Sequence, residues 1–312
     1  MALNCNKIQI TNKIIVLTIK QKEMNLNIYL KRGVLMLALA LGTLHSCNED
    51  VNENELIATN SDPSFTITPV AGKMNTYVLT SQANNYISSR WDIGYGPYVG
   101  KMTEEISLPD AGTYTVTHIA VGAGGATKEV SHEIVVAQSD PSKPNLVKGG
   151  FFNDAADAAQ WTSLNLSPTG AAFWSFDKGS ATIHATGWAQ EGIYQAIDVV
   201  KDKEYTIDML VMSPSGSDET WLEVYAGKSV PESGVVYNDN KVMGLSTWDG
   251  CAKSDFKGRL SIVGCVKNSS TGSVSNVVKF DTTGKIYLLI RSGGNKFTKD
   301  GITIGRVEMR AK

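Results

Sequence analysis

Short strand-like segments separated by turns dominate this sequence from about residue 65 onward. In SFTITPV (64–70), TYVLTS (76–81) and TYTVTHIAV (113–121), β-branched or aromatic residues alternate with polar ones. That period of two is typical of a strand with one buried face. Glycine is common and proline scarce, with 29 and 9 residues, and no long helical period follows the N-terminus. We therefore predict an all-β protein, and 312 residues leave room for one large or two ordinary domains.

The charge balance argues against one class of partner. The formal net charge is −2 and the isoelectric point is about 6.1. Binding to a phosphate backbone relies on an excess of basic side chains, which this chain lacks. We expect no nucleic-acid partner.

Residues 1–46 have the layout of an export signal. Basic Lys31 and Arg32 precede an apolar run from Val34 to Leu44, which is too short to span a hydrocarbon core of about 30 Å. A normal basic segment would begin near Met24, so we expect residues 1–23 not to be translated. The sequence Leu-His-Ser-Cys that ends at Cys47 resembles the lipobox of bacterial lipoproteins. This resemblance implies that Cys47 is lipidated and becomes the new N-terminus; the alternative is a plain secretory signal with an incidental cysteine.

Residues 47–62 are acidic and rich in asparagine, and their apolar residues show no regular spacing. Such a composition predicts a solvated, disordered tether. The segment Asn48-Glu49-Asp50 resembles the acidic signal that sends Bacteroidetes lipoproteins to the cell surface. The resemblance implies a lipoprotein anchored in the outer membrane and exposed at the surface.

Residues 63–139 predict an immunoglobulin-like sandwich. The strand-like runs are short, and the glycine-rich segment from Gly122 to Thr127 is typical of a hairpin. RWDIGYGPYVG (90–100) and the following PDAGTYTV (109–116) resemble a PKD domain. The residues that fit its turn motif are Trp91, Asp92, Gly94 and Gly96, whereas Ile93 and Tyr95 depart from it. The resemblance implies a spacer domain.

Residues 140–145 form a short link that Pro141 and Pro144 stiffen, and residues 146–312 predict a second β-sandwich. Turn signals separate the candidate strands, and one jelly roll suits this length. The candidate strands are 180–185, 193–199, 205–212, 221–225, 277–280, 286–291 and 302–309.

Three segments of this second half carry a family resemblance. NLVKGGFFNDAADAAQWT (145–162), GWAQEGIYQAIDVVKDKEYTIDMLV (187–211) and GKIYLLIRSGG with GITIGRVEMR (284–310) resemble the galactose-binding-like jelly roll of carbohydrate-binding modules, families four and nine. In that family an aspartate, often tied to a structural calcium, usually stands near the positions that Gly305 and Arg306 occupy here, so we do not predict calcium. The segment 220–265 resembles C-terminal domains of Bacteroidetes surface glycan-binding lipoproteins. These resemblances imply a polysaccharide or oligosaccharide ligand and a starch-utilisation-type uptake complex as partner.

Catalytic patterns are absent from the sequence. His118, His132 and His184 lie in strand-like stretches without metal-site spacing, and no Gly-x-Ser-x-Gly elbow occurs. A glycosidase needs two carboxylates about 5 to 10 Å apart, and the sequence pairs none of its candidates. These candidates are Glu191, Asp208, Glu219, Glu223 and Asp249. We predict a non-enzyme with no catalytic residue, no metal and no cofactor.

Aromatic residues are the stronger indication of function, because five of the six tryptophans lie beyond residue 146. A flat ring can stack on the C–H face of a pyranose while the sugar hydroxyls keep their hydrogen bonds at the rim. In TWLEVYA (220–226), alternation places Leu222 and Val224 on one face and Trp221, Glu223 and Tyr225 on the other. Arg291 ends a strand and could donate to sugar hydroxyls. For each tryptophan, packing in the core is the alternative role, and for Trp161 it is the role that we expect. The predicted glycan-binding residues are Trp174, Trp188, Trp221, Tyr225, Trp248 and Arg291.

Cys251 and Cys265 are the two cysteines that follow Cys47. In an exported chain they are expected to form a disulfide, which would stabilise the fold by about 3 kcal/mol on the chain-entropy model. The bond would also hold the loop of Trp248, and an ordered platform loses less entropy on binding. Two free buried thiols are the alternative.

These patterns favour a non-catalytic surface protein that binds a polysaccharide for uptake. We expect a β-glucan such as laminarin as ligand, because related modules bind β-glucans. A small jelly-roll glycoside hydrolase or lyase and a structural or adhesive surface protein are the two other hypotheses.

Overall fold

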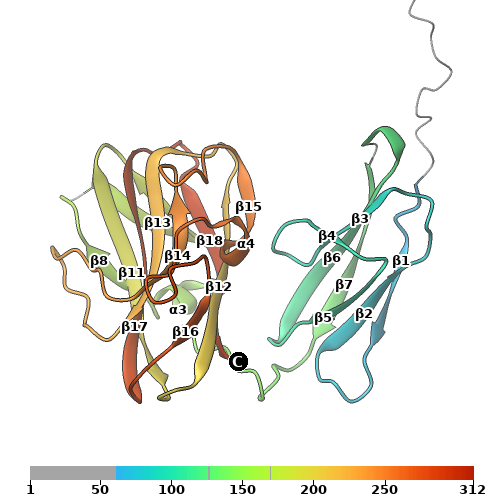
Figure 1. The fold of residues 1–312 in the computed structure, drawn as a ribbon, viewed down its shortest axis with the longest axis horizontal. Coiled ribbons are helices and arrows are strands. Elements are labelled where there is room, and N and C mark those ends of the chain that lie inside the picture. The colour runs from blue at the N-terminus through green and yellow to red at the C-terminus, as the bar shows by residue number, and fades with distance from the viewer. Residues whose placement is uncertain (1–60, 126, 169) are drawn as a thin grey trace, which may run out of the picture. The chain divides into compact units, whose positions relative to one another are not determined.

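The computed structural model describes residues 61–125, 127–168 and 170–312. The predicted signal segment 1–46, the lipidation site Cys47 and all but the end of the tether 47–62 lie outside the described residues. Within the described parts the chain is all-β, as predicted (Figure 1). The described helical elements are short: a 3-10 turn at Ala123–Gly125 and the helices α3 (Ala155–Ala158) and α4 (Leu260–Val263). None of the helices in these residues is both long and apolar enough to cross a membrane.

The strands of residues 65–136 build an N-terminal sandwich of two antiparallel sheets (Figure 1). One sheet has the order β1-β2-β5 and the other β4-β3-β6-β7. The strands are β1 (Phe65–Pro69), β2 (Thr76–Ser81), β3 (Ser88–Asp92), β4 (Tyr98–Gly100), β5 (Thr103–Ser107), β6 (Gly112–Val121) and β7 (Thr127–Val136). This is the seven-stranded, immunoglobulin-like arrangement expected from the sequence.

Trp91 forms the centre of the N-terminal sandwich. It is fully buried, its indole Nε1 donates to the carbonyl of Lys101 at 2.9 Å, and His118 stacks on it with ring centroids 4.2 Å apart. The next residue, Asp92, accepts the backbone N–H groups of Gly94 and Gly96 at 2.7 and 3.0 Å. Both glycines have positive φ, which explains their place in this turn.

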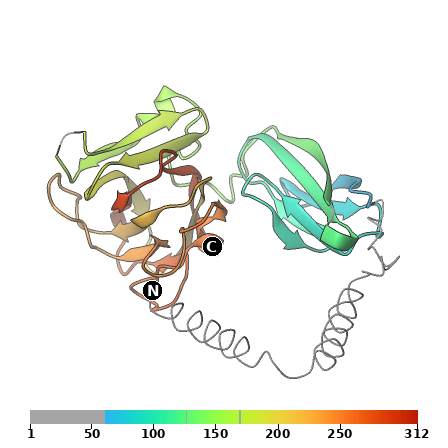
Figure 2. The ribbon, with the colours of Figure 1, turned by 90° about the horizontal axis from the view of Figure 1, so that it is seen from above.

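The strands of residues 162–311 build a C-terminal sandwich (Figure 2). Its five-stranded sheet has the order β14-β13-β17-β11-β8, and its second sheet has the order β15-β12-β18-β10-β9, with β16 paired to β12. The strands are β8 (Thr162–Asn165), β9 (Ala172–Asp177), β10 (Ser180–Ala185), β11 (Ala189–Val199), β12 (Glu204–Ser213), β13 (Asp218–Gly227), β14 (Lys241–Ser246), β15 (Phe256–Arg259), β16 (Val277–Lys279), β17 (Gly284–Lys296) and β18 (Ile302–Ala311).

The main core lies between these two sheets. Leu222 and Val224 point into it from β13 and are fully buried, as the alternation in TWLEVYA predicts. Trp161 also belongs to this core, stacked on Phe152 with ring centroids 5.8 Å apart, in agreement with its expected structural role. The opposite side of the five-stranded sheet is called the outer face below, and it carries the candidate site.

Candidate functional site

Trp188 and Trp248 form an exposed aromatic pair. Their side chains are 71% and 57% exposed, whereas the other four tryptophans are buried or half-buried. The two rings are nearly parallel, at 20°, and their centroids lie 6.4 Å apart. Trp188 immediately precedes β11, after a turn at Gly187 whose φ of +66° favours glycine. Two large apolar faces are thus presented together to solvent.

Strand pairing explains why these two residues meet. Thr247 donates its backbone N–H to the carbonyl of Thr220 at 3.0 Å, Thr220 pairs with Gly294, and Gly294 pairs with Ala189. These residues form one row across β14, β13, β17 and β11. Trp248 follows Thr247, Trp188 precedes Ala189, and Glu219 and Asn295 are the chain neighbours of Thr220 and Gly294, so all four lie just beyond this row at the end of the sheet.

Two polar residues, Glu219 and Asn295, lie at this end of β13 and β17, the two strands between those that position the tryptophans. Asn295 Nδ2 donates to Glu219 Oε2 at 2.6 Å, and Lys296 Nζ lies 3.1 Å from Glu219 Oε1. The hydrogen bonds from Asn295 and Lys296 hold the pKa of Glu219 below its ordinary value. The aromatic pair is therefore accompanied by an ionised carboxylate and an amide that can accept and donate hydrogen bonds.

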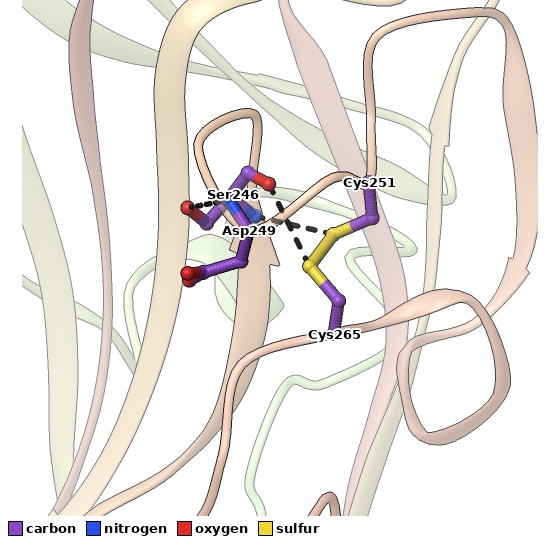
Figure 3. Close-up of a disulfide and its surroundings, with 4 residues drawn as sticks. All are labelled: Ser246, Asp249, Cys251 and Cys265. Carbon is purple, nitrogen blue, oxygen red and sulfur yellow. Dashed lines mark hydrogen bonds between the residues drawn. A yellow bond between two sulfur atoms is a disulfide. The ribbon is translucent and has the colours of Figure 1, made fainter.

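A disulfide closes the turn that carries Trp248. Cys251 and Cys265 are bonded, with Cα atoms 6.0 Å apart, so the predicted disulfide is confirmed (Figure 3). The turn is closed further by the N–H of Cys251, which donates to the carbonyl of Ser246 at 3.2 Å, and by the N–H of Asp249, which donates to Ser246 Oγ at 3.2 Å. The covalent bond ties this turn to the segment after α4. The Trp248 loop is thus anchored at its far end.

Trp221 lies in the next row of the outer face, where it pairs with Gly293. A Cβ atom on Gly293 would come within 2.8 Å of the Trp221 ring, so the glycine leaves room for the indole to lie across β17. Trp221 is half-buried. Its ring centroid lies 4.9 Å from the guanidinium carbon of Arg291, in cation–π contact.

A charged network follows on the same face. Glu223 accepts from Tyr225 Oη at 2.6 Å, from Arg291 Nη2 at 3.0 Å and from Lys241 Nζ at 3.1 Å. Burial raises the pKa of Glu223, but the hydrogen bonds of Tyr225 and Lys241 and the charge of Arg291 outweigh it, so the pKa lies below its ordinary value. Tyr225 and Arg291 point away from the core, yet they are only 3% and 5% exposed.

Their low exposure is due to the segment 228–240, which we call the strap. It leaves the sheet between β13 and β14, and the N–H of Gly234 donates to the carbonyl of Asn165 at the end of β8 at 2.7 Å. Because β14 and β8 are opposite edges of the sheet, the strap crosses its outer face. Tyr237 packs edge-to-face on Tyr225 at 5.8 Å, and Asn238 Oδ1 accepts from Arg291 Nη2 at 3.3 Å.

The sequence reasoning did not identify the strap, Glu219 or Asn295 as parts of this site. A weak signal for the strap exists in SVPESGVVYNDN (229–240), a turn-rich run that contains the apolar residues Val235, Val236 and Tyr237. The position of Glu219 and Asn295 at this end of the sheet follows only from the pairing of β13 with β17.

Trp174 lies apart from the other predicted binding residues. It is on β9 in the second sheet, pairs with Ile183, and packs half-buried against the main core. The structure thus brings together Trp188, Trp221, Tyr225, Trp248 and Arg291 on the five-stranded sheet and its loops, and places Trp174 elsewhere.

Of the candidate carboxylates, Glu219 and Glu223 lie on β13 and Asp249 in the Trp248 turn, whereas Asp208 and Glu191 are buried elsewhere. Asp208 is buried in the second sheet, where Ser261 Oγ donates to it at 2.6 Å, and Glu223 is engaged by Arg291 and Lys241. Glu191 is 4% exposed, and its carboxylate accepts the N–H of Leu166 at 3.4 Å, which is its one side-chain hydrogen bond within the described residues. Burial therefore raises the pKa of Glu191, against the smaller effect of that hydrogen bond. Among the described residues, no group of three or more His, Cys, Asp or Glu side chains could hold a metal ion.

Comparison with known protein families and with curated proteins finds no match. Solved structures do resemble the chain. Carbohydrate-binding modules from the β-sandwich superfamily match at 13% identity over 79% of this chain and 96% of that one, with a TM-score of 0.32. A family-four carbohydrate-binding module matches at 15% identity over 53% and 99%, with a TM-score of 0.28. The enzymatically active domain of tailspike protein 4 from bacteriophage CBA120 matches at 12% identity over 57% and 23%, with a TM-score of 0.30.

Proposed function

We propose that the C-terminal sandwich binds a polysaccharide without cleaving it, and that Trp188 and Trp248 are its principal contact. The observation that carries this proposal is the exposure of two nearly parallel indole rings at one end of a sheet. Exposed apolar patches on soluble proteins mark interaction sites. A pyranose offers the matching surface, because its C–H face buries the indoles while its hydroxyls bond to neighbours such as Glu219 and Asn295.

The polar groups of the site support binding rather than cleavage. A glycosidase needs one carboxyl with a raised pKa and a second carboxylate near the same bond. Glu219 and Glu223 both have lowered pKa values and hydrogen-bonded cations. Neither is suited to protonate a leaving group. Glu191 has a raised pKa but is buried.

The sequence supports a wider proposal for the whole chain. Lipidation of Cys47 would anchor the protein in the outer membrane, and residues 47–62 would tether it at the cell surface. The N-terminal sandwich would then act as a PKD-like spacer. The C-terminal sandwich would hold a glycan, of which laminarin is our first candidate, near a starch-utilisation-type uptake complex.

Affinity electrophoresis tests the binding function. The chain from Asn48 onward is run through gels that contain laminarin, mixed-linkage glucan, xylan, mannan or levan. Retardation by one glycan that is lost in Trp188→Ala or Trp248→Ala, with the glycan unchanged in size, is the expected result. Phe173→Ala is a matched control, because Phe173 is a 52% exposed aromatic residue on β9. A shortened glycan would instead indicate the hydrolase or lyase hypothesis, and retardation that survives in both tryptophan variants would contradict the assigned site.

A further inference from the structure

We propose that the strap opens over a second sugar subsite, in which Arg291 is the hydrogen-bond donor to the ligand. This inference rests on the proposed function and extends the site from the exposed tryptophan pair along the outer face. It assigns a role to a covered surface that Tyr225, Arg291 and Glu223 form beneath residues 228–240.

Arg291 has buried hydrogen-bond donors without a partner among the described residues. Its Nη2 makes all of its hydrogen bonds, to Glu223 Oε2, Tyr225 Oη and Asn238 Oδ1, at 3.0, 2.8 and 3.3 Å. Its Nε and Nη1 are buried without any partner among the described residues. Leaving a buried donor unpaired is energetically unfavourable, and more so for a charged group. A ligand oxygen that entered beneath the strap would remove this cost.

The strap is held mainly at its two ends, and its middle makes few contacts with the sheet. At the ends, Lys228 pairs with Asp281 at 2.9 Å and Asn240 Nδ2 donates to the carbonyl of Ala226 at 2.7 Å. In between, Tyr237 packs with Tyr225 and Leu289, Asn238 contacts Arg291 at 3.3 Å, and the N–H of Gly234 donates to Asn165 at 2.7 Å. Its outward side chains Val230 and Val235 are 56% and 55% exposed. A surface hollow of about 340 Å³ lies among the strap's own residues. The strap could thus detach without disturbing the main core, to which none of its residues belongs.

The covered surface continues from the tryptophan pair along the outer face. Trp221 pairs with Ser246 and Gly293, two rows along the sheet from Trp188 and Trp248, with the row of Thr220 and Gly294 between them. Its ring contacts Arg291, whose guanidinium carbon also lies 4.9 Å from the Tyr225 ring. A chain seated on the exposed pair would therefore meet Trp221 and then the Arg291–Tyr225 surface. The strap covers the part of the outer face over which that glycan chain would extend.

The charges indicate the class of ligand. Glu223 lies 3.0 Å from Arg291 and 3.1 Å from Lys241, so the guanidinium already has a carboxylate partner. A carboxylate or sulfate on the sugar would be placed against Glu223. The subsite therefore fits a neutral sugar unit that stacks on Tyr225 and accepts hydrogen bonds through hydroxyl or ring oxygens.

Arginine modification tests the opening without a glycan. The chain from Asn48 onward is treated with phenylglyoxal, and the adduct at Arg291 is followed by mass spectrometry with exposed Arg90 as the rate standard. We expect slow modification of Arg291 in the wild type and modification at least tenfold faster in Tyr237→Ala. Val236→Ala is the matched control, because Val236 is 48% exposed on the same segment, and we expect the wild-type rate. An Arg291 that stays unmodified in the wild type after Arg90 has reacted completely would overturn the proposal.

A length series tests the subsite itself. Calorimetric titration with laminari-oligosaccharides of two to six units is expected to show an affinity gain of at least tenfold with length in the wild type. Arg291→Lys should lose this gain yet keep the affinity for the shortest ligand, and bound laminarin should protect Arg291 from phenylglyoxal. An unaltered length dependence in Arg291→Lys, or no protection by laminarin that is bound, contradicts the subsite. If no glycan retards the wild type, the proposed function fails and the subsite with it, whereas the modification rate of Arg291 still reports strap opening.

Discussion

The indole rings of Trp188 and Trp248 lie 6.4 Å apart and nearly parallel, although β13 and β17 separate the strands that position them. Trp188 lies immediately before β11, and Trp248 lies two residues after the end of β14. Each ring therefore extends from the end of the sheet toward the other. A ligand that contacts one ring is therefore within reach of the second. This arrangement predicts that both tryptophans contribute to the affinity for the same glycan chain.

Replacement of either tryptophan should weaken binding strongly. Trp188→Ala and Trp248→Ala each remove an exposed stacking surface, and a loss of about 1.4–2.8 kcal/mol corresponds to a 10- to 100-fold rise in Kd. Because both side chains are exposed, the free energy of unfolding should change by less than about 0.5 kcal/mol. Calorimetric titration and urea unfolding measure the two quantities. Equal Kd values for the wild type and both variants would remove the pair from the site, and Phe173→Ala should retain the wild-type Kd.

Loss of the Cys251–Cys265 disulfide should lower both stability and affinity. On the chain-entropy model, a loop of this length contributes about 3 kcal/mol to the free energy of unfolding. Without the bond, the turn of Trp248 keeps only its hydrogen bonds around Ser246, so Trp248 has more freedom to lose on binding. We expect Cys251→Ser with Cys265→Ser to show a weaker Kd for the glycan than the oxidised wild type, measured below the unfolding transition. An unchanged Kd in a destabilised variant would show that the disulfide does not order the binding loop.

The fold class was predictable because alternation is a local property. It revealed β2, β6 and β18, whose buried residues recur every second position over part of their length. The strand β14 was missed because five of its six residues are buried, so its sequence KVMGLS does not alternate. The strand β8 has only four residues, too few for a period to be recognised.

The site was predictable in its parts but not in its assembly. Trp188 follows Gly187, and Trp248 lies in the polar run STWDGC (246–251); both sequences are typical of loops, and both side chains are exposed. Their proximity depends on the order β14-β13-β17-β11, which is set by pairing between segments far apart in sequence. Alternation also placed Tyr225 on the outer face. Alternation predicts the face on which a side chain lies, but it does not predict whether another segment covers that face, as the strap covers Tyr225 and Arg291.

Glu191→Gln should stabilise the protein at neutral pH. Burial raises the pKa of Glu191 in the folded state, so folding disfavours its ionised form at pH values above the unfolded pKa of about 4.3. The wild type thus gains stability from this group as pH falls through the folded pKa, whereas glutamine does not titrate. We expect the variant to be more stable by about 1 kcal/mol at pH 7, with the difference vanishing near pH 4. Urea unfolding of both proteins at each pH measures it, and a difference that does not change with pH would contradict the assignment.

Acidification should lower the stability of the N-terminal sandwich because His118 is buried in it. This residue is fully buried; its Nε2 lies 2.9 Å from Ser89 Oγ, and its Nδ1 lies 2.8 Å from the carbonyl of Pro63. These partners suit a neutral ring that donates from Nδ1 and accepts at Nε2. Burial lowers the pKa of His118, and its hydrogen bond to Pro63 and the charge of Asp62 only partly oppose this effect.

The direction of the pH effect follows from that lowered pKa. An unfolded histidine titrates near pH 6.5, so the stability that neutral His118 contributes is complete above this pH and is lost as pH falls through the folded pKa. Amide hydrogen exchange, corrected for its intrinsic pH dependence, should therefore become faster in β3 and β6 between pH 7.5 and 5.5. In His118→Gln this change should disappear, because the amide can bond to Ser89 and Pro63 without titrating. Equal acceleration in the variant would assign the effect to other groups, and β13 and β17 serve as internal controls because they belong to the C-terminal sandwich.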